Sequence, residues 1–291
     1  MTMPPAVEET RETAPSPGQV ALRVGAVWAA LTLAWTLVGV VRHEILRPHL
    51  SYDVAQVVQA LFAGVLGVGV VVLACKLIDR RTIASLGLGS LRQEWPALAK
   101  GAGLWLGLAV VGLAVGVGIG AFRLEFGAPN AAFVGWFVLQ LGLVFCYEAL
   151  PEELALRGYV FTNLRARTPR WVAVLGQAVV FMLWAFAFVG LLQLLGYDTS
   201  WSLTFDRVVL FLTFGITLAL VRLWTGSLWG SIGYHLAYQT ITQLMTHDRL
   251  VVVRTPGEND LLNAQFFLWI FPIAIGGLLV LGLLRRRGGT P

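Results

Sequence analysis

The sequence predicts an all-α fold, a polytopic membrane bundle of about eight transmembrane helices. Of its 291 residues, 57% are hydrophobic and only 13% are charged, whereas soluble domains contain about 25% charged residues. The apolar residues also come in long runs, and a run of about 18 or more predicts a membrane-spanning helix. We therefore expect a multi-pass protein of the cell membrane whose outer surface contacts membrane lipid.

Eight apolar runs are long enough to cross a bilayer, and no linker divides residues 19–287, so we expect one transmembrane bundle. The sixth and seventh runs are short and are separated only by Thr225 to Ser227. Residues 1–18 are polar and proline-rich and contain glutamates, unlike the basic start of a signal peptide, and they predict a disordered cytoplasmic tail. The expected spans are about Val20–Val41, Val54–Cys75, Leu98–Ala121, Phe133–Leu156, Val172–Leu195, Val208–Trp224, Leu228–Met245 and Leu262–Leu284.

The distribution of Lys and Arg predicts that both termini are cytoplasmic. With the N-terminus inside, fifteen of the 21 basic residues fall on the cytoplasmic side, which agrees with the positive-inside rule. The six on the other side are Arg42, Arg47, Arg123, Arg207, Arg249 and Arg254. The net charge of +5 is thus explained by topology, and it predicts no nucleic-acid partner.

Small residues and one polar segment suggest how the bundle packs. Gly112, Gly116 and Gly120 form a stripe that fits either dimerisation or close helix packing within the monomer, and we favour the latter. The segment Lys76–Lys100 predicts a short interfacial helix or turn on the cytoplasmic face. Cys75 and Cys146 both fall in expected spans and lack metal-ligand spacing, so they read as small buried hydrophobes.

The most informative segment is PEELALRGYVF, from Pro151 to Phe161, at the end of the fourth span. Ionisable residues are costly inside a membrane, so such a cluster is a functional-site hypothesis by default. Glu153 and Arg157 have the favourable spacing for an ion pair within a helix. Glu152 points about 100° away around the helix and is free to face a cavity.

Two neighbours complete this cluster. Pro151 lacks an N–H and is expected to kink the helix and free the carbonyl of Tyr147. Glu148 lies one turn before Glu152, and two carboxylates that close repel each other, which suits one of them to act as a general base. The alternative is a helix-end salt bridge that anchors the bundle at the cytoplasmic interface.

A polar stripe marks the seventh span. It must face the interior of the bundle rather than lipid. We therefore expect the histidine of this stripe to lie near the carboxylates of the fourth span. The stripe comprises His235, Gln239, Thr242, Gln243 and Thr246.

These residues resemble the CPBP family of intramembrane proteases, which includes the CAAX prenyl endopeptidases and the Abi bacteriocin-processing proteins. The family pattern is EExxxR, then FxxxH, then HxxxN. Glu152, Glu153 and Arg157 match the first motif, and His235 with Gln239 in place of asparagine nearly matches the third. In the second motif, Phe181 is present but Ala185 stands where the family has histidine.

The resemblance covers about Phe133–Met245 and implies a site made of Glu152, Glu153, Arg157, His235 and Gln239. It also implies a divalent metal such as Zn²⁺ as cofactor, with Glu153 and His235 as its ligands, and no other cofactor. A catalytic zinc normally has three protein ligands, however, and the other histidines, His43, His49 and His247, fall in expected extracytoplasmic loops.

Three functions remain open. The first, which the missing histidine favours, is a degenerate family member: an immunity-type or another non-catalytic protein that binds a partner in the membrane. The second is a working metallo- or glutamate-dependent endopeptidase that cleaves a membrane-associated peptide or protein from the cytoplasmic side. The third is a small transporter, although no internal repeat supports it.

Overall fold

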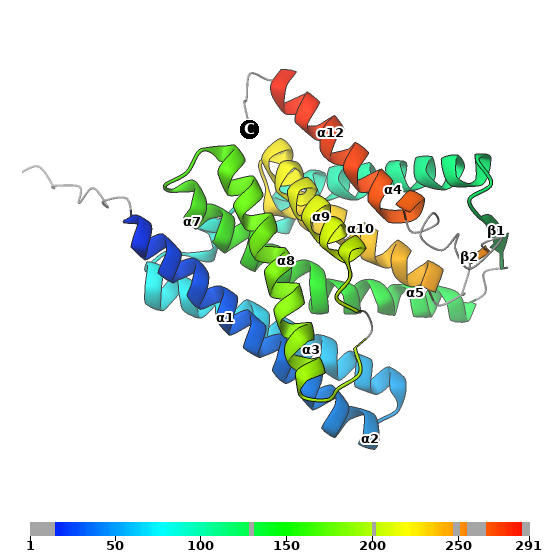
Figure 1. The fold of residues 1–291 in the computed structure, drawn as a ribbon, viewed down its shortest axis with the longest axis horizontal. Helices are drawn as coiled ribbons and strands as arrows, with labels where there is room; N and C mark the ends of the chain where they lie inside the picture. The colour runs from blue at the N-terminus through cyan, green and yellow to red at the C-terminus, as the bar shows by residue number, and fades with distance from the viewer. Residues whose placement is uncertain (1–14, 128–130, 200–201, 247–250, 255–265, 287–291) are drawn as a thin grey trace, which may run out of the picture.

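The structure is a computed structural model that describes residues 15–127, 131–199, 202–246, 251–254 and 266–286. Helices make up almost all of these residues, which confirms the all-α prediction (Figure 1). Two short strands, β1 (Arg123–Phe126) and β2 (Val251–Arg254), pair antiparallel with Arg123 opposite Arg254. The α-helices are α1 (Pro17–Val41), α2 (Arg47–His49), α3 (Tyr52–Leu73), α4 (Leu91–Gly118), α5 (Ala131–Val144), α6 (Leu150–Glu152), α7 (Phe161–Arg165), α8 (Arg170–Leu194), α9 (Phe205–Thr225), α10 (Leu228–Thr246) and α12 (Phe271–Arg286).

Wider or tighter turns extend several of these helices. The π-helical turns are Arg42–Leu46, Ala74–Asp79, Phe145–Ala149, Glu153–Val160 and Phe266–Ile270, and Ile83–Leu86 is a 3₁₀ turn. Among the described residues, seven continuous helical segments are long and apolar enough to cross a membrane: Pro17–His49, Tyr52–Asp79, Ile83–Gly118, Phe133–Arg165, Arg170–Leu194, Phe205–Thr225 and Phe266–Arg286.

The remaining expected span is α10, which is a helix but is not among those seven. Its 19 residues rise about 28 Å, enough to cross the hydrocarbon core. Its polar side chains lower its mean hydropathy, because this helix carries much of the candidate site. Together these segments confirm a polytopic bundle of about eight helices.

The segment Lys76–Lys100 contains a short 3₁₀ turn, Ile83–Leu86, in agreement with the expected short helix or turn. The rest of the segment is shorter than expected, because α4 already begins at Leu91 and continues through Pro96. Pro96 lies inside α4, where it removes one helical hydrogen bond, and the helix nevertheless continues through it.

Glycines bring the helices close together. A Cβ at Gly112 would lie 2.6 Å from the carbonyl oxygen of Phe267, so this position packs α4 against the start of the last span. A Cβ at Gly116 would collide with the ring of Phe122, whereas Gly120 has open space. The first two glycines of the stripe therefore pack within the monomer, as favoured.

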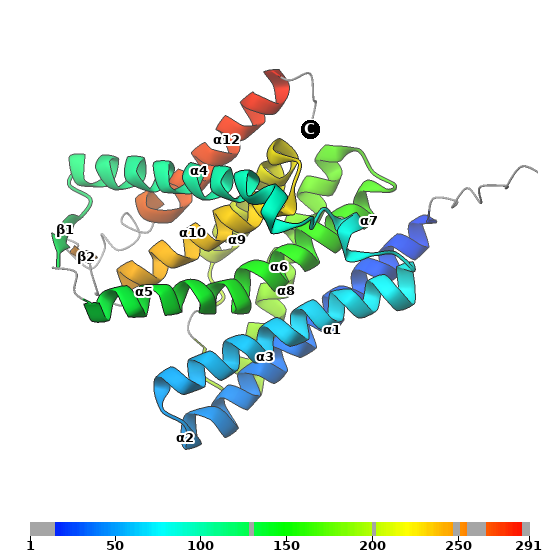
Figure 2. The ribbon, with the colours of Figure 1, turned by 180° about the vertical axis from the view of Figure 1, so that it is seen from behind.

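The segment that runs from α5 to α7 carries the acidic motif. Figure 2 shows α3 beside both α1 and this segment. A Cβ at Gly67 would lie 2.7 Å from the Cβ of Pro151 and 2.7 Å from the Cη2 of Trp35. At Gly64, the carbonyl oxygen of Cys146 is equally close, at 2.7 Å. Only glycine allows α3 to approach the kinked segment this closely.

Candidate functional site

The helix that carries the acidic motif is irregular where the motif lies. π-Helical turns flank the single α-helical turn α6, which contains Pro151. Proline removes a backbone hydrogen bond, and π turns are frequent at functional sites. All ten residues from Pro151 to Val160 are buried. The expected disturbance at Pro151 is therefore present, and it widens the helix at the centre of the bundle.

Glu153 forms the expected ion pair with Arg157. The Arg157 Nη1 lies 3.0 Å from the Glu153 Oε1, and both side chains are fully buried. The guanidinium also stacks on the ring of Phe181 from α8, 4.4 Å from its centroid. The pair is thus held between two helices and does not lie at a solvated helix end, as the salt-bridge alternative would have it.

The same carboxylate orients the histidine of α10. The Nδ1 of His235 lies 2.9 Å from the Glu153 Oε1. An ionised carboxylate can only accept a hydrogen bond, so the paired Glu153 places the proton on Nδ1. The Nε2 of His235 lies 4.0 Å from the Oε2 of Glu152.

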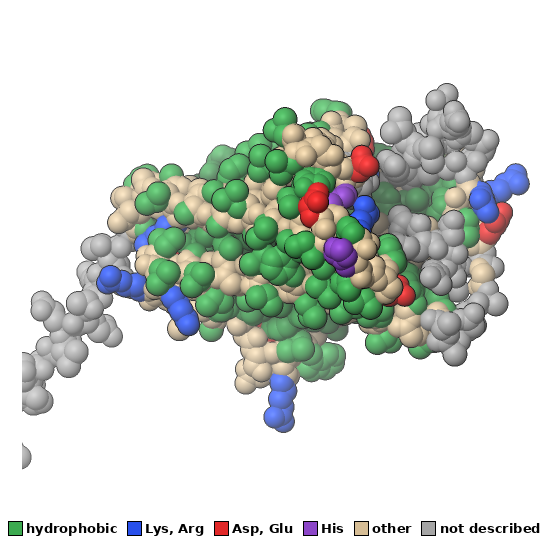
Figure 3. Space-filling model, turned by 90° about the horizontal axis from the view of Figure 1, so that it is seen from below, with side chains coloured by type: hydrophobic (Ala, Val, Ile, Leu, Met, Phe, Trp, Pro, Cys, Tyr) green, Lys and Arg blue, Asp and Glu red, His purple; other side chains and the backbone are tan. Residues whose placement is uncertain are grey.

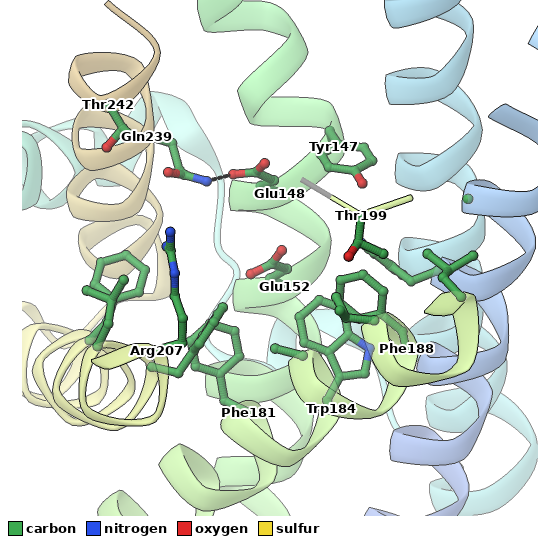
Figure 4. Close-up of a pocket in the computed structure, with 18 of the residues that line it drawn as sticks. Tyr147, Glu148, Glu152, Phe181, Trp184, Phe188, Thr199, Arg207, Gln239 and Thr242 are labelled. Atoms are coloured by element: carbon green, nitrogen blue, oxygen red, sulfur yellow. Dashed lines mark hydrogen bonds between the residues drawn. The ribbon is translucent and has the colours of Figure 1, made fainter. Parts of the chain in front are cut away.

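Glu152 and Glu148 face a cavity of about 360 Å³. Figure 4 shows the two carboxylates entering it from the same helix, with Gln239 of α10 bonded to Glu148. His235 lines the same cavity, together with Thr242 and Gln243. The polar stripe of α10 therefore faces the carboxylates as expected, and the side chain of Thr246 lies outside the described residues.

The opposite wall of the cavity is apolar and comes mainly from α8. Phe181, Trp184 and Phe188 line it, and Trp184 packs edge-on against Trp35 with ring centroids 5.2 Å apart. Ala185 lines the cavity from the same helix and is 1% exposed. The register of the second motif therefore holds, and the site has a methyl group where its resemblance implies an imidazole.

Several cavity residues were not expected from the sequence, among them Arg42, His43 and Arg207; His43 in particular was expected in a loop away from the site. Arg207, in the first turn of α9, lines the cavity, and Figure 4 shows its guanidinium pointing toward Gln239. The sequence placed Arg207 in a loop near the membrane surface because an arginine at the start of an apolar run is typical of a span boundary. Only the crossing of α9 over α10 brings it to the site.

The donor atoms do not make a complete zinc site. No group of three or more His, Cys, Asp or Glu among the described residues is arranged to hold a metal ion. The predicted ligands Glu153 and His235 also occupy each other, because the Nδ1 of the ring is bonded to the carboxylate. These residues fit a three-ligand zinc site poorly, and the metal stays a prediction.

Comparison with known proteins identifies the part of the chain that carries this site. Residues 133–241 match the family model described as Type II CAAX prenyl endopeptidase Rce1-like. The match includes all three motif positions and covers the segments from α5 to α10. The resemblance deduced from the motifs is therefore confirmed over this stretch. No match was found among curated proteins.

Proposed function

We propose that this CAAX-protease-like membrane protein binds a membrane-associated peptide in the cavity but has lost most of the capacity to hydrolyse it. One observation carries the proposal: Ala185 lines the cavity in the register of the second motif. The carboxylates and His235 are retained on one side of the cavity, while position 185 on the facing wall presents only a methyl group.

The side of the cavity formed by Glu152 and His235 is arranged for proton transfer. Glu152 lies 4.0 Å from the Nε2 of His235, a gap that one bound water or substrate group can bridge. A carboxylate at this distance is able to accept a proton from an attacking water. The ion pair of Glu153 with Arg157 fixes the histidine ring and leaves Glu152 available.

The absence of an imidazole at position 185 explains why we expect a low rate of peptide hydrolysis. Peptide hydrolysis builds negative charge on the carbonyl oxygen, and a donor must face that oxygen to stabilise it. Removing one such donor costs about 10²–10³ in rate in well-studied enzymes, and members of one catalytic unit act together. An alanine at position 185 has no hydrogen-bond donor. We therefore expect the protein to bind the peptide but to hydrolyse it slowly.

A second candidate is a working glutamate-dependent endopeptidase. The observation that favours it is Arg207, whose guanidinium extends into the same cavity. A guanidinium can donate hydrogen bonds to a developing oxyanion, so it would take over the role of the absent histidine. Under this candidate, the rate would depend on both Glu152 and Arg207.

A cleavage assay separates the two candidates. The purified protein and its Glu152→Gln variant would be incubated with a quenched prenylated CAAX-type peptide and with an unprenylated apolar peptide. We expect only trace Glu152-dependent cleavage by the wild-type chain, and binding of at least one peptide by fluorescence anisotropy. Clear cleavage that Glu152→Gln abolishes would establish the working endopeptidase instead.

The Ala185→His variant tests whether the lost histidine is the defect. A new imidazole would face Glu152 and His235 across the cavity, and we expect a gain of at least tenfold in Glu152-dependent cleavage. Ala187→His is the matched control, because this residue lies on the same helix but does not line the cavity. An equal response of the two histidine variants would show that position 185 has no special role.

The zinc prediction has its own measurement. Metal analysis of the purified wild-type and Glu153→Gln proteins would give the metal content per chain. We expect less than one tenth of an equivalent of zinc in the wild-type protein, because the donor set is incomplete. A stoichiometric metal that is lost in Glu153→Gln would restore the metalloprotease interpretation.

A further inference from the structure

Among the described residues, the lining of the cavity extends to one end of the bundle. Its outer lining comes from the end of the first span, Arg42 and His43, from Asp198 and Thr199 after α8, and from Arg207 in the first turn of α9. A neighbouring cavity of about 300 Å³ also includes Arg42 and reaches Glu148. All these positions lie at the end of the bundle opposite the N-terminus of α1.

Figure 3 views the molecule from below, toward the side where α2 lies. Histidine, arginine and acidic side chains gather there among apolar ones. Asp198 is exposed, whereas Arg42, His43 and Arg207 are partly buried. A peptide approaching from this side meets a polar entrance before it reaches Glu152.

The other end of the bundle is closed by a network of charged side chains. Asp79 is 1% exposed and pairs with the Nε of Arg23 at 3.0 Å and with the Nη2 of Arg81 at 2.6 Å. Tyr159, which follows the acidic motif, donates a hydrogen bond to the Asp79 Oδ1 at 3.1 Å. These contacts join α1, α3 and the motif-bearing helix beneath the site.

A second set of contacts completes this closure. The turn Ile83–Leu86 folds back under the site, and Leu86 is fully buried. The Nη2 of Arg222 donates to the Leu86 carbonyl at 2.8 Å, and the N–H of Leu228 donates to the Gly87 carbonyl at 2.9 Å. The turn therefore seals the bundle where α9 meets α10, and a peptide cannot reach Glu152 from this end.

The sealed end is also the basic end. Among the described residues it carries Arg23, Lys76, Arg80, Arg81, Arg92, Lys100, Arg165, Arg167, Arg170, Arg222, Arg285 and Arg286, whereas the open end carries Arg42, Arg47, Arg123, Arg207 and Arg254. Helices that cross a bilayer in succession alternate in direction, so all loops at one end lie on one side of the membrane. The basic side is the cytoplasmic side.

We propose that the cavity takes its peptide from the extracytoplasmic side of the membrane. This is opposite to the cytoplasmic access expected from the sequence. The ligand class becomes an exported peptide, or the outer-leaflet part of a membrane protein, with apolar side chains for the wall formed by Phe181, Trp184 and Phe188. That the ligand is a peptide rests on the proposed function, whereas the side of access does not.

Cysteine accessibility tests the side of access without any substrate. In a chain carrying Cys75→Ala and Cys146→Ala, single reporter cysteines would be placed at Asp198→Cys at the entrance and at Arg92→Cys at the sealed end, both exposed positions. A membrane-impermeant maleimide should label Asp198→Cys in intact cells and Arg92→Cys only after permeabilisation. The reverse pattern would overturn the proposal.

A second reporter pair tests whether the entrance leads to the site. Ala185→Cys lines the cavity, whereas Ala187→Cys on the same helix does not. A small, charged thiosulfonate reagent added outside should modify Ala185→Cys at least tenfold faster than Ala187→Cys. Modification of Ala185→Cys only in inside-out vesicles would overturn the proposal. The expected labelling combined with a failure to bind any peptide would reject the proposed function alone.

Discussion

Two groups of buried or partly buried acidic residues lie in this bundle, and they differ in their partners. Asp79 at the sealed end pairs with two arginines and also accepts hydrogen bonds from Tyr159 and Asn163, at 3.1 and 3.4 Å. In the cavity, Glu148 contacts the neutral amide of Gln239. Glu152 lies 4.0 Å from a histidine nitrogen. A carboxylate surrounded by cations holds helices together, whereas one with weak partners and a cavity beside it is available for a ligand.

Glu153 resembles Asp79 in its contacts, because it is paired with charged or hydrogen-bonding side chains. It is adjacent in sequence to Glu152, yet its Oε1 is held by Arg157 at 3.0 Å and by His235 at 2.9 Å. The comparison therefore separates two neighbouring glutamates: Glu153 is held by Arg157 and His235, whereas Glu152 faces the cavity. Mutations that remove one partner at a time test this division.

The largest effect is expected for Arg157→Ala. This change leaves Glu153 charged and fully buried, and breaking such a buried pair costs about 3–5 kcal/mol. We expect a large loss of folded protein, measured by fluorescence-detected gel filtration and by thermal unfolding in detergent. Adding Glu153→Gln should restore part of the loss, because it removes the unpaired charge. Wild-type stability of Arg157→Ala would mean that the pair does not hold the helix.

A smaller effect is expected for Asp79→Asn. The side chains of Arg23 and Arg81 are 21% and 23% exposed, so water partly compensates for the lost carboxylate. We expect a loss of about 1–3 kcal/mol, below that of a fully buried pair. The matched control is Asp53→Asn, an exposed position in the first turn of α3, where the change should stay within about 0.5 kcal/mol. Equal losses in the two variants would show that the Asp79 network does not seal the bundle.

The smallest effect on stability is expected for Glu152→Gln. The amide keeps the shape of the side chain and removes a charge that has only a distant partner, so unfolding should change by less than about 1 kcal/mol. The same variant should nevertheless change peptide binding or cleavage clearly. A destabilisation as large as that of Arg157→Ala would place Glu152 with the structural carboxylates and contradict the comparison.

Much of the fold was readable from the sequence, because long apolar runs and the spacing of Glu153 and Arg157 depend on local geometry. The meeting of the acidic motif with His235 was also predictable, since buried polar groups in lipid must find one another. Helix α10 was also predicted as a span, although its polar side chains leave it outside the seven described helices that are long and apolar enough to cross a membrane.

Other features of the candidate site depend on tertiary structure, and the sequence contains no clear signal for them. The position of Arg207 at the cavity follows from how α9 crosses α10, and nothing around Arg207 in the sequence marks that crossing. The π-helical turns around Pro151 were expected only as a kink, because their register depends on the contact between Gly67 and Pro151. The side on which the cavity opens depends on which helix ends are sealed, and this emerges only in three dimensions.

The single oxygen that Glu153 shares between Arg157 and His235 has a consequence for how such chains diverge. Loss of any of these three residues would leave buried polar groups without partners and would threaten folding before it affected chemistry. The histidine of the second motif has no such protection, since an alanine in its place simply lines a cavity. Selection for a folded chain would therefore be enough to keep Glu153, Arg157 and His235 in place even in a chain that no longer catalysed a reaction.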